Sequence, residues 1–332
     1  MEHIDQPMSS EDNIEESAIS SDPDKRRRYS LAKKALVLLI VFAIGGEGGY
    51  LAGSRLGHEA STPSSTKADQ DSHMALMDQV NPPEGYQLPA VFGDIGPKMI
   101  AAGAIDLVKF TDLYKQQNQP LTDEQVAILS LGSQEKVTFD RSNAYFLLNF
   151  FWALGLANQN AILTEGPMAS QGMDKIGGFA STGGWTLGTK PATDLYASQL
   201  ILKLTNVQQA TLLQVASAVY RPCCNNPTDF PDCNHGMALL GLLELMASQG
   251  ASADDLFQAA KYVTAFWYPL QMLEIATAIQ AAQKVDFNQA DARAVVSQQI
   301  ASISGFQAVH QWLAQNGLLQ QAPSSGGSCG VK

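Results

Sequence analysis

The sequence predicts an all-α domain that follows a single transmembrane helix near the N-terminus. Apolar residues recur at helical spacing through most of residues 106–316, and a strand signal is confined to residues 136–139. One uninterrupted apolar run, residues 35–46, lies close to the N-terminus. Together these observations predict a membrane anchor joined to a multi-helix domain with long Gly/Pro-rich loops.

The predicted anchor covers residues 35–53. These 19 residues would span ~28 Å as a helix, about the thickness of the hydrocarbon core of a bilayer. Six basic residues lie between Lys25 and Lys34, whereas only Arg55 follows the anchor closely. The positive-inside rule therefore places the N-terminus in the cytoplasm and the C-terminal domain outside it.

A cleaved signal peptide is the alternative interpretation, because the strictly apolar run is only twelve residues long. The 34 residues before the run are too many for the basic segment of a signal peptide. Residues 51–53, Leu-Ala-Gly, also make a poor cleavage site. The sequence therefore favours a retained anchor and a single-pass membrane protein.

The remainder of the chain divides by composition. Residues 1–34 are predicted to form a disordered cytoplasmic tail, because they are charged and lack hydrophobic periodicity. The polar residues 54–73 are expected to form a flexible stalk and residues 322–332 a flexible tail. The folded extracytoplasmic domain is therefore predicted to cover residues 74–321.

Several helices of this domain can be placed from their patterns. Residues 142–158 are apolar on almost every side, which predicts the central buried helix. Thr122 and Gln125 form a capping box at the start of another helix, and Pro269 must separate or kink two more. The other predicted helices are residues 106–114, 194–204, 206–220, 236–248, 252–268, 270–284, 289–302 and 305–316.

Two segments do not fit helices. Residues 80–97 contain many Pro and Gly residues and are expected to wrap the domain as extended chain. Residues 172–188 form a glycine-rich loop without a nucleotide-binding motif. Glu244 and Glu274 lie on apolar helices, and both are expected to face solvent.

The charge distribution excludes one class of partner. The net charge is −11, and residues 54–332 carry 23 acidic residues against 15 basic ones. Nucleic-acid binding needs clustered Lys and Arg, and the domain has no such stripe. The sequence therefore excludes nucleic acid as a partner, whereas the apolar run near the N-terminus predicts the membrane as one.

One cluster indicates chemistry. Cys223, Cys224, Cys233 and His235 lie in the spacing Cys-Cys-x8-Cys-x-His between two predicted helices. Thiolates and imidazole are ligands for soft transition metals, so the loop predicts a site for zinc or copper. A tetrahedral site requires about four ligands, and we therefore expect at least three of these four side chains to converge.

The residues around the cluster suggest supporting roles. Asp229 and Asp232 are candidates to orient His235, and Met237 adds a thioether that suits copper. Phe230, between two prolines, is expected to hold the loop against the helices.

Two alternatives remain for the same cysteines. Outside the cytoplasm, Cys223 or Cys224 can form a disulfide with Cys233, and the other can reach Cys329. The domain would then be a stapled scaffold or partner-binding module without metal. A thiol-dependent enzyme is the third alternative, although the sequence contains no serine elbow, carboxylate dyad or His-Glu-x-x-His motif.

Overall fold

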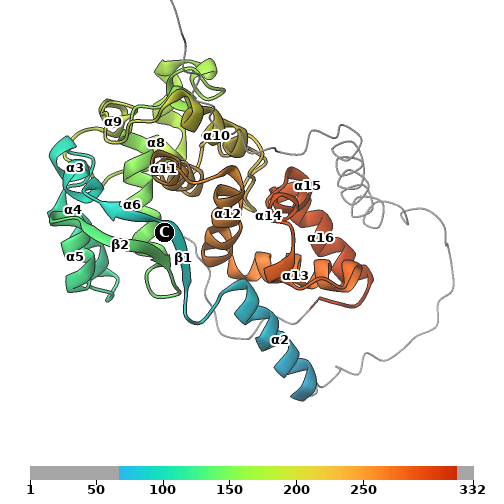
Figure 1. The fold of residues 1–332 in the computed structure, drawn as a ribbon. Coiled ribbons are helices and arrows are strands. Elements are labelled where there is room, and N and C mark those ends of the chain that lie inside the picture. The colour runs from blue at the N-terminus through green and yellow to red at the C-terminus, as the bar shows by residue number, and fades with distance from the viewer. Residues whose placement is uncertain (1–66, 320–332) are drawn as a thin grey trace, which may run out of the picture. The chain divides into compact units, whose positions relative to one another are not determined.

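The computed structural model describes residues 67–319, which are mostly helical (Figure 1). The α-helices are α2 (Lys67–Val80), α3 (Ile95–Ala102), α4 (Leu107–Gln116), α5 (Asp123–Ser130), α6 (Ala144–Ala157), α7 (Ala161–Thr164), α8 (Ala180–Gly183), α9 (Ala192–Leu195), α10 (Asn206–Ala216), α11 (Asn234–Ser248), α12 (Ala253–Trp267), α13 (Pro269–Gln283), α14 (Ala292–Val295), α15 (Gln298–Ala301) and α16 (Ile303–Gln315). Three short 3-10 helices, η1 (Ala169–Gln171), η2 (Met173–Gly178) and η3 (Phe287–Gln289), and two strands, β1 (Tyr86–Gly93) and β2 (Ser133–Phe139), complete the list. The prediction of a helical domain is confirmed, with one small sheet added.

Helices α6 and α11 pack against each other in the core. Both are apolar on nearly all sides, and most of their side chains are buried. A Cβ atom at Gly241 would lie 2.5 Å from the backbone nitrogen of Gly155 and from the carbonyl oxygen of Phe151. The two backbones therefore approach as closely as they do because glycine is present where they meet. The central position predicted for residues 142–158 is confirmed.

Local sequence signals set several helix ends. The Thr122–Gln125 capping box begins α5 as predicted, and Ser252 with Asp255 forms another at α12. Pro269 occupies the first turn of α13, where its missing N–H costs no helical hydrogen bond. It separates α12 from α13, which packs against both α2 and α16 (Figure 1).

A two-stranded antiparallel sheet adds to the helices. Strand β1 pairs with β2, with Tyr86 opposite Phe139 and Val91 opposite Lys136. The extended chain predicted within residues 80–97 is present, but its last residues turn into α3. Residues 136–139 belong to β2, as their pattern indicates.

Two predicted helices are wrong over most of their length. Within residues 194–204, helix ends at Leu195, and the side chain of Asn158 accepts hydrogen bonds from the backbone N–H groups of Ile201 and Leu202. Those backbone groups thus find a partner outside any helix. Residues 289–302 form only the short helices α14 and α15.

The glycine-rich segment 172–188 contains η2 and α8, and most of the rest is turn. At the other end, α2 begins at Lys67, inside the segment predicted as a stalk. The predicted anchor, residues 35–53, lies outside the described residues. Between residues 67 and 319, no helix has both the length and the apolar character that a membrane span requires.

Glu244 is fully buried on α11, which corrects the expectation that it faces solvent. The side-chain amide of Asn158 donates a hydrogen bond of 3.0 Å to its Oε2 atom. Burial raises the pKa of the Glu244 carboxyl well above its ordinary value. The hydrogen bond between Asn158 and Glu244 therefore links the end of α6 to α11. Glu274 is half-buried and lies 2.8 Å from Nδ1 of His310 on α16.

Gly241→Ala should destabilise the domain by about 2 kcal/mol, because the added methyl group forces α6 and α11 apart. The measurement is the free energy of unfolding of the full chain in detergent micelles. Gly178→Ala is the matched control, because a Cβ atom there meets nothing within 4 Å. Equal stability of the Gly241 variant and the wild type would contradict the packing described.

Glu244→Gln should flatten the pH dependence of stability. The folded chain keeps a proton on Glu244 that the unfolded chain releases above its ordinary pKa of 4.5. The stability from that proton is complete below the unfolded-state pKa and is lost as pH rises toward the folded-state pKa. Urea denaturation at acidic and neutral pH measures the slope. Glu135→Gln, at an exposed site on β2, is the control. A Glu244→Gln slope identical to that of the wild type would show that the carboxyl does not titrate differently on folding.

Candidate metal centre

The loop between α10 and α11 carries the predicted site, and it folds back along the end of α10. Helix α10 ends at Ala216. The backbone N–H of Thr228 then donates to the carbonyl of Val219, and that of Asp229 donates to the carbonyl of Ala216. Pro222 lacks an N–H group and cannot continue a helix, so the chain reverses over the intervening residues.

The same loop is held from the opposite side by the start of α16. The N–H of Ile303 donates to the carbonyl of Cys224 at 2.9 Å. Both the N–H and the hydroxyl of Ser304 donate to the side chain of Asn225. The positions of Cys224 and Asn225 are therefore held by hydrogen bonds to residues 79 positions later in the chain.

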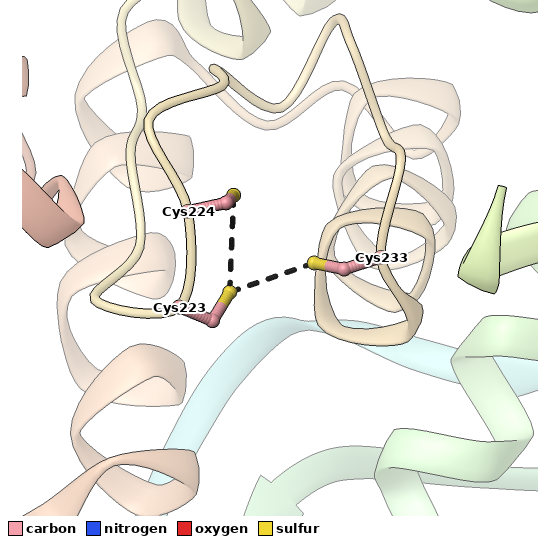
Figure 2. Close-up of side chains that lie close together, drawn as sticks. All are labelled: Cys223, Cys224 and Cys233. Atoms are coloured by element: carbon pink, nitrogen blue, oxygen red, sulfur yellow. Dashed lines mark hydrogen bonds between the residues drawn. The ribbon is translucent and has the colours of Figure 1, made fainter.

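Three sulfur atoms converge in this loop (Figure 2). The Sγ atom of Cys223 lies 3.9 Å from that of Cys224 and 3.5 Å from that of Cys233. All three sulfurs lie within 4.8 Å of one another. The prediction that at least three of the four candidate side chains converge is confirmed. All three are free thiols, so the disulfide between Cys233 and its neighbours is not found. Cys329 lies outside the described residues.

Helix α11 positions Cys233. This cysteine is the N-cap residue of that helix, and its sulfur accepts a hydrogen bond from the N–H of Gly236 at 3.3 Å. A helix N-terminus carries partial positive charge, which favours a thiolate over a thiol at this position.

Arg221 is fully buried beside the three sulfurs. Its guanidinium donates to Thr228 Oγ1 at 2.9 Å, to Cys224 Sγ at 3.4 Å and to Cys233 Sγ at 3.9 Å. Among residues 67–319, no acidic side chain forms an ion pair with it. The cluster therefore lies next to a buried positive charge whose nearest source of negative charge is the thiols themselves.

The ionisation of the thiols follows from these contacts. The thiols of Cys223 and Cys224 hydrogen-bond to Cys233 and, together with Arg221, hold the pKa of Cys233 well below its ordinary value. The hydrogen bonds with Cys224 and Cys233, together with burial, raise the pKa of Cys223. Cys233 is thus the most readily ionised of the three thiols, with the thiol of Cys223 3.5 Å from its sulfur, whereas the thiol of Cys224 donates to the carbonyl of Asn226.

His235, predicted as the fourth ligand, is not part of the three-sulfur group. Its Nδ1 atom lies 2.9 Å from Oδ1 of Asn234. Its ring packs on the side chains of Tyr268 and Trp267, with distances between ring centroids of 4.6 Å and 5.6 Å. Burial lowers its pKa to about 4, so the imidazole is neutral at physiological pH. It follows Cys233 by two residues, in the first turn of α11.

The other residues singled out in the sequence have structural contacts. Asp232 accepts a hydrogen bond from Asn226, and no hydrogen bond joins Asp229 or Asp232 to His235 among the described residues. Phe230 packs edge-on against Phe179 at 5.6 Å, which holds the loop against the domain as expected. Met237 is fully buried in the core.

Comparisons of the chain with protein-family models, curated proteins and solved structures give no match. The function of the chain is therefore inferred from its own geometry. The three cysteines are evident from the sequence, whereas the burial of Arg221 beside them is not. The one signal for this residue was its place immediately before Pro222 and the adjacent cysteines.

Proposed function

We propose that this chain is a membrane-anchored extracytoplasmic protein that binds a soft transition metal, zinc or copper, through Cys223, Cys224 and Cys233. The observation that carries the proposal is the convergence of three sulfurs within 4.8 Å. Thiolates at such spacing can share one ion, and soft metals prefer them to oxygen ligands.

The way in which the loop is held also supports a metal site. The backbone of α10, the start of α16 and the N-terminus of α11 each fix part of the cluster by hydrogen bonds. A site preorganised in this manner avoids the cost of ordering its ligands when the ion binds. The metal would therefore be held by ligands that are already close to their bound positions, with His235 as the candidate for a fourth.

A disulfide-stapled module is the second candidate function. The separation of 3.5 Å between the sulfurs of Cys223 and Cys233 favours it, because a small movement would bring them to bonding distance. Oxidising conditions outside the cytoplasm would supply the driving force. A domain stapled in this way would serve as a scaffold or bind a partner without metal.

The membrane anchor at residues 35–53 and the outward orientation of the domain are part of the proposal. They are supported by the apolar run and by the basic residues that precede it.

The full chain, purified in detergent micelles under reducing conditions, should carry about one zinc or copper ion per chain by elemental analysis. Cys233→Ser should remove most of the metal, because it takes away the sulfur that lies beside both helix α11 and Arg221. Cys329→Ser is the matched control and should keep the metal content of the wild type.

Counting free thiols in the same samples by mass spectrometry separates the two candidates. Metal-free chain with Cys223 and Cys233 joined as a disulfide would contradict the metal site and favour the stapled module. Metal lost equally from the Cys233 and Cys329 variants would contradict the assignment of the ligands.

A reporter enzyme that is active only outside the cytoplasm should be active when fused after residue 319 and inactive when fused after residue 20. The anchor and its basic flank predict this orientation. Activity at both positions, or at neither, would contradict the proposed topology.

A further inference from the structure

The buried guanidinium of Arg221 constrains the charge of any ion that the cluster holds. We infer that the site is built for a divalent, tetrahedral metal of the zinc type, with all three cysteines as thiolates, Arg221 as the counter-charge and a neutral fourth ligand. This inference rests on the proposed function and narrows it to one class of ion and one charge state.

The distances between the sulfur atoms fit a tetrahedral metal ion. Two thiolates bound to tetrahedral zinc, with bonds of about 2.3 Å, lie ~3.8 Å apart. Cys223 Sγ lies 3.9 Å from Cys224 Sγ and 3.5 Å from Cys233 Sγ, on either side of that value. Two edges of the sulfur triangle therefore lie near the length that a tetrahedral ion requires, and the third, between Cys224 and Cys233, is within 4.8 Å. Linear copper(I) would instead place two sulfurs at twice the bond length, whereas trigonal copper(I) has sulfur separations close to those of zinc. The charge of the ion, rather than the sulfur separations, therefore separates zinc from trigonal copper(I).

The net charge of the cluster favours a divalent ion. Three thiolates and one divalent ion carry a net charge of −1, and Arg221 brings the total to zero. The same thiolates on copper(I) would leave −1 after Arg221 is counted. Because Arg221 is fully buried and hydrogen-bonded to two of the sulfurs, uncompensated charge at this place is costly. A divalent ion is the one that balances the cluster.

The same balance restricts the fourth ligand. An imidazole or a water molecule keeps the net charge at zero, whereas a further thiolate, such as that of Cys329, would leave −1. Cys223 is exposed, so water can reach the cluster, and His235 follows Cys233 by two residues in the first turn of α11. The site is thus a three-thiolate centre with a neutral donor, rather than a four-cysteine centre.

The test compares zinc affinities of the full chain in detergent micelles under reducing conditions, by competition with a chromophoric chelator. Arg221→Met, which removes the charge, should weaken zinc binding at least ~10-fold, the usual effect of losing a residue that supports metal ligands. Arg221→Lys, which keeps the charge, should recover most of this loss. Arg141→Met removes an arginine far along the chain that also bonds a backbone carbonyl, and it should bind zinc as the wild type does.

Alkylation in the presence of zinc gives a second readout that needs no variant. Zinc should protect three thiols of the wild-type chain, and mass spectrometry with peptide mapping should identify them as Cys223, Cys224 and Cys233. Protection of two thiols, or of four including Cys329, would overturn the inference. If Arg221→Met does not fold, the Arg221→Lys variant and the number of protected thiols test the inference. An Arg221→Lys variant that folds but loses zinc would also overturn the inference.

These outcomes distinguish a failure of metal binding from a failure of the role assigned to Arg221. A wild-type chain that binds neither zinc nor copper would end the proposed function. A wild-type chain that binds zinc, together with an Arg221→Met variant that binds it equally well, would overturn only the role of Arg221. Copper(I) held by all three thiolates, with zinc held by fewer, would overturn the choice of a divalent ion.

Discussion

The close approach of α6 and α11 fixes the position on which the candidate site depends. Gly155 and Gly241 allow the two backbones to meet, and a single added methyl group at Gly241 would collide with the backbone of α6. Because α11 is held in this way, its N-terminus is fixed, and Cys233 at its N-cap is fixed with it. The buried pair of Glu244 and Asn158 ties the same two helices together farther along α11. The core of the domain therefore acts as the support of one of the three sulfurs.

The other two sulfurs are positioned by a different part of the chain. The loop that contains Cys223 and Cys224 is tied to the end of α10 through Ala216 and to the start of α16 through Ser304. Arg221 lies inside this loop and contributes a charge that no carboxylate among the described residues neutralises by an ion pair. A buried cation beside thiols stabilises their ionised form, and a metal ion bound by those thiolates completes the balance. The geometry and the charge of the loop thus both support a metal site.

The sequence predicts what depends on local patterns and less of what depends on distant partners. Helix α6 and the capping box at Thr122 were predicted, because periodicity and capping are local properties. Strand β1 was predicted only as extended chain, since its partner β2 lies some 45 residues later. Residues 196–204 were predicted as helix because nothing local reveals that the side chain of Asn158 binds their backbone. At the site, the three cysteines were evident from their spacing. The burial of Arg221 and the packing of His235 on Tyr268 arise only when the loop folds back.

X-ray absorption at the zinc edge, on the full chain loaded with one equivalent of zinc, tests the central claim most directly. The account predicts three sulfur neighbours at about 2.3 Å and one nitrogen or oxygen neighbour at about 2.0–2.1 Å. A zinc ion surrounded only by nitrogen and oxygen, or by a single sulfur, would show that the three cysteines do not form the centre described.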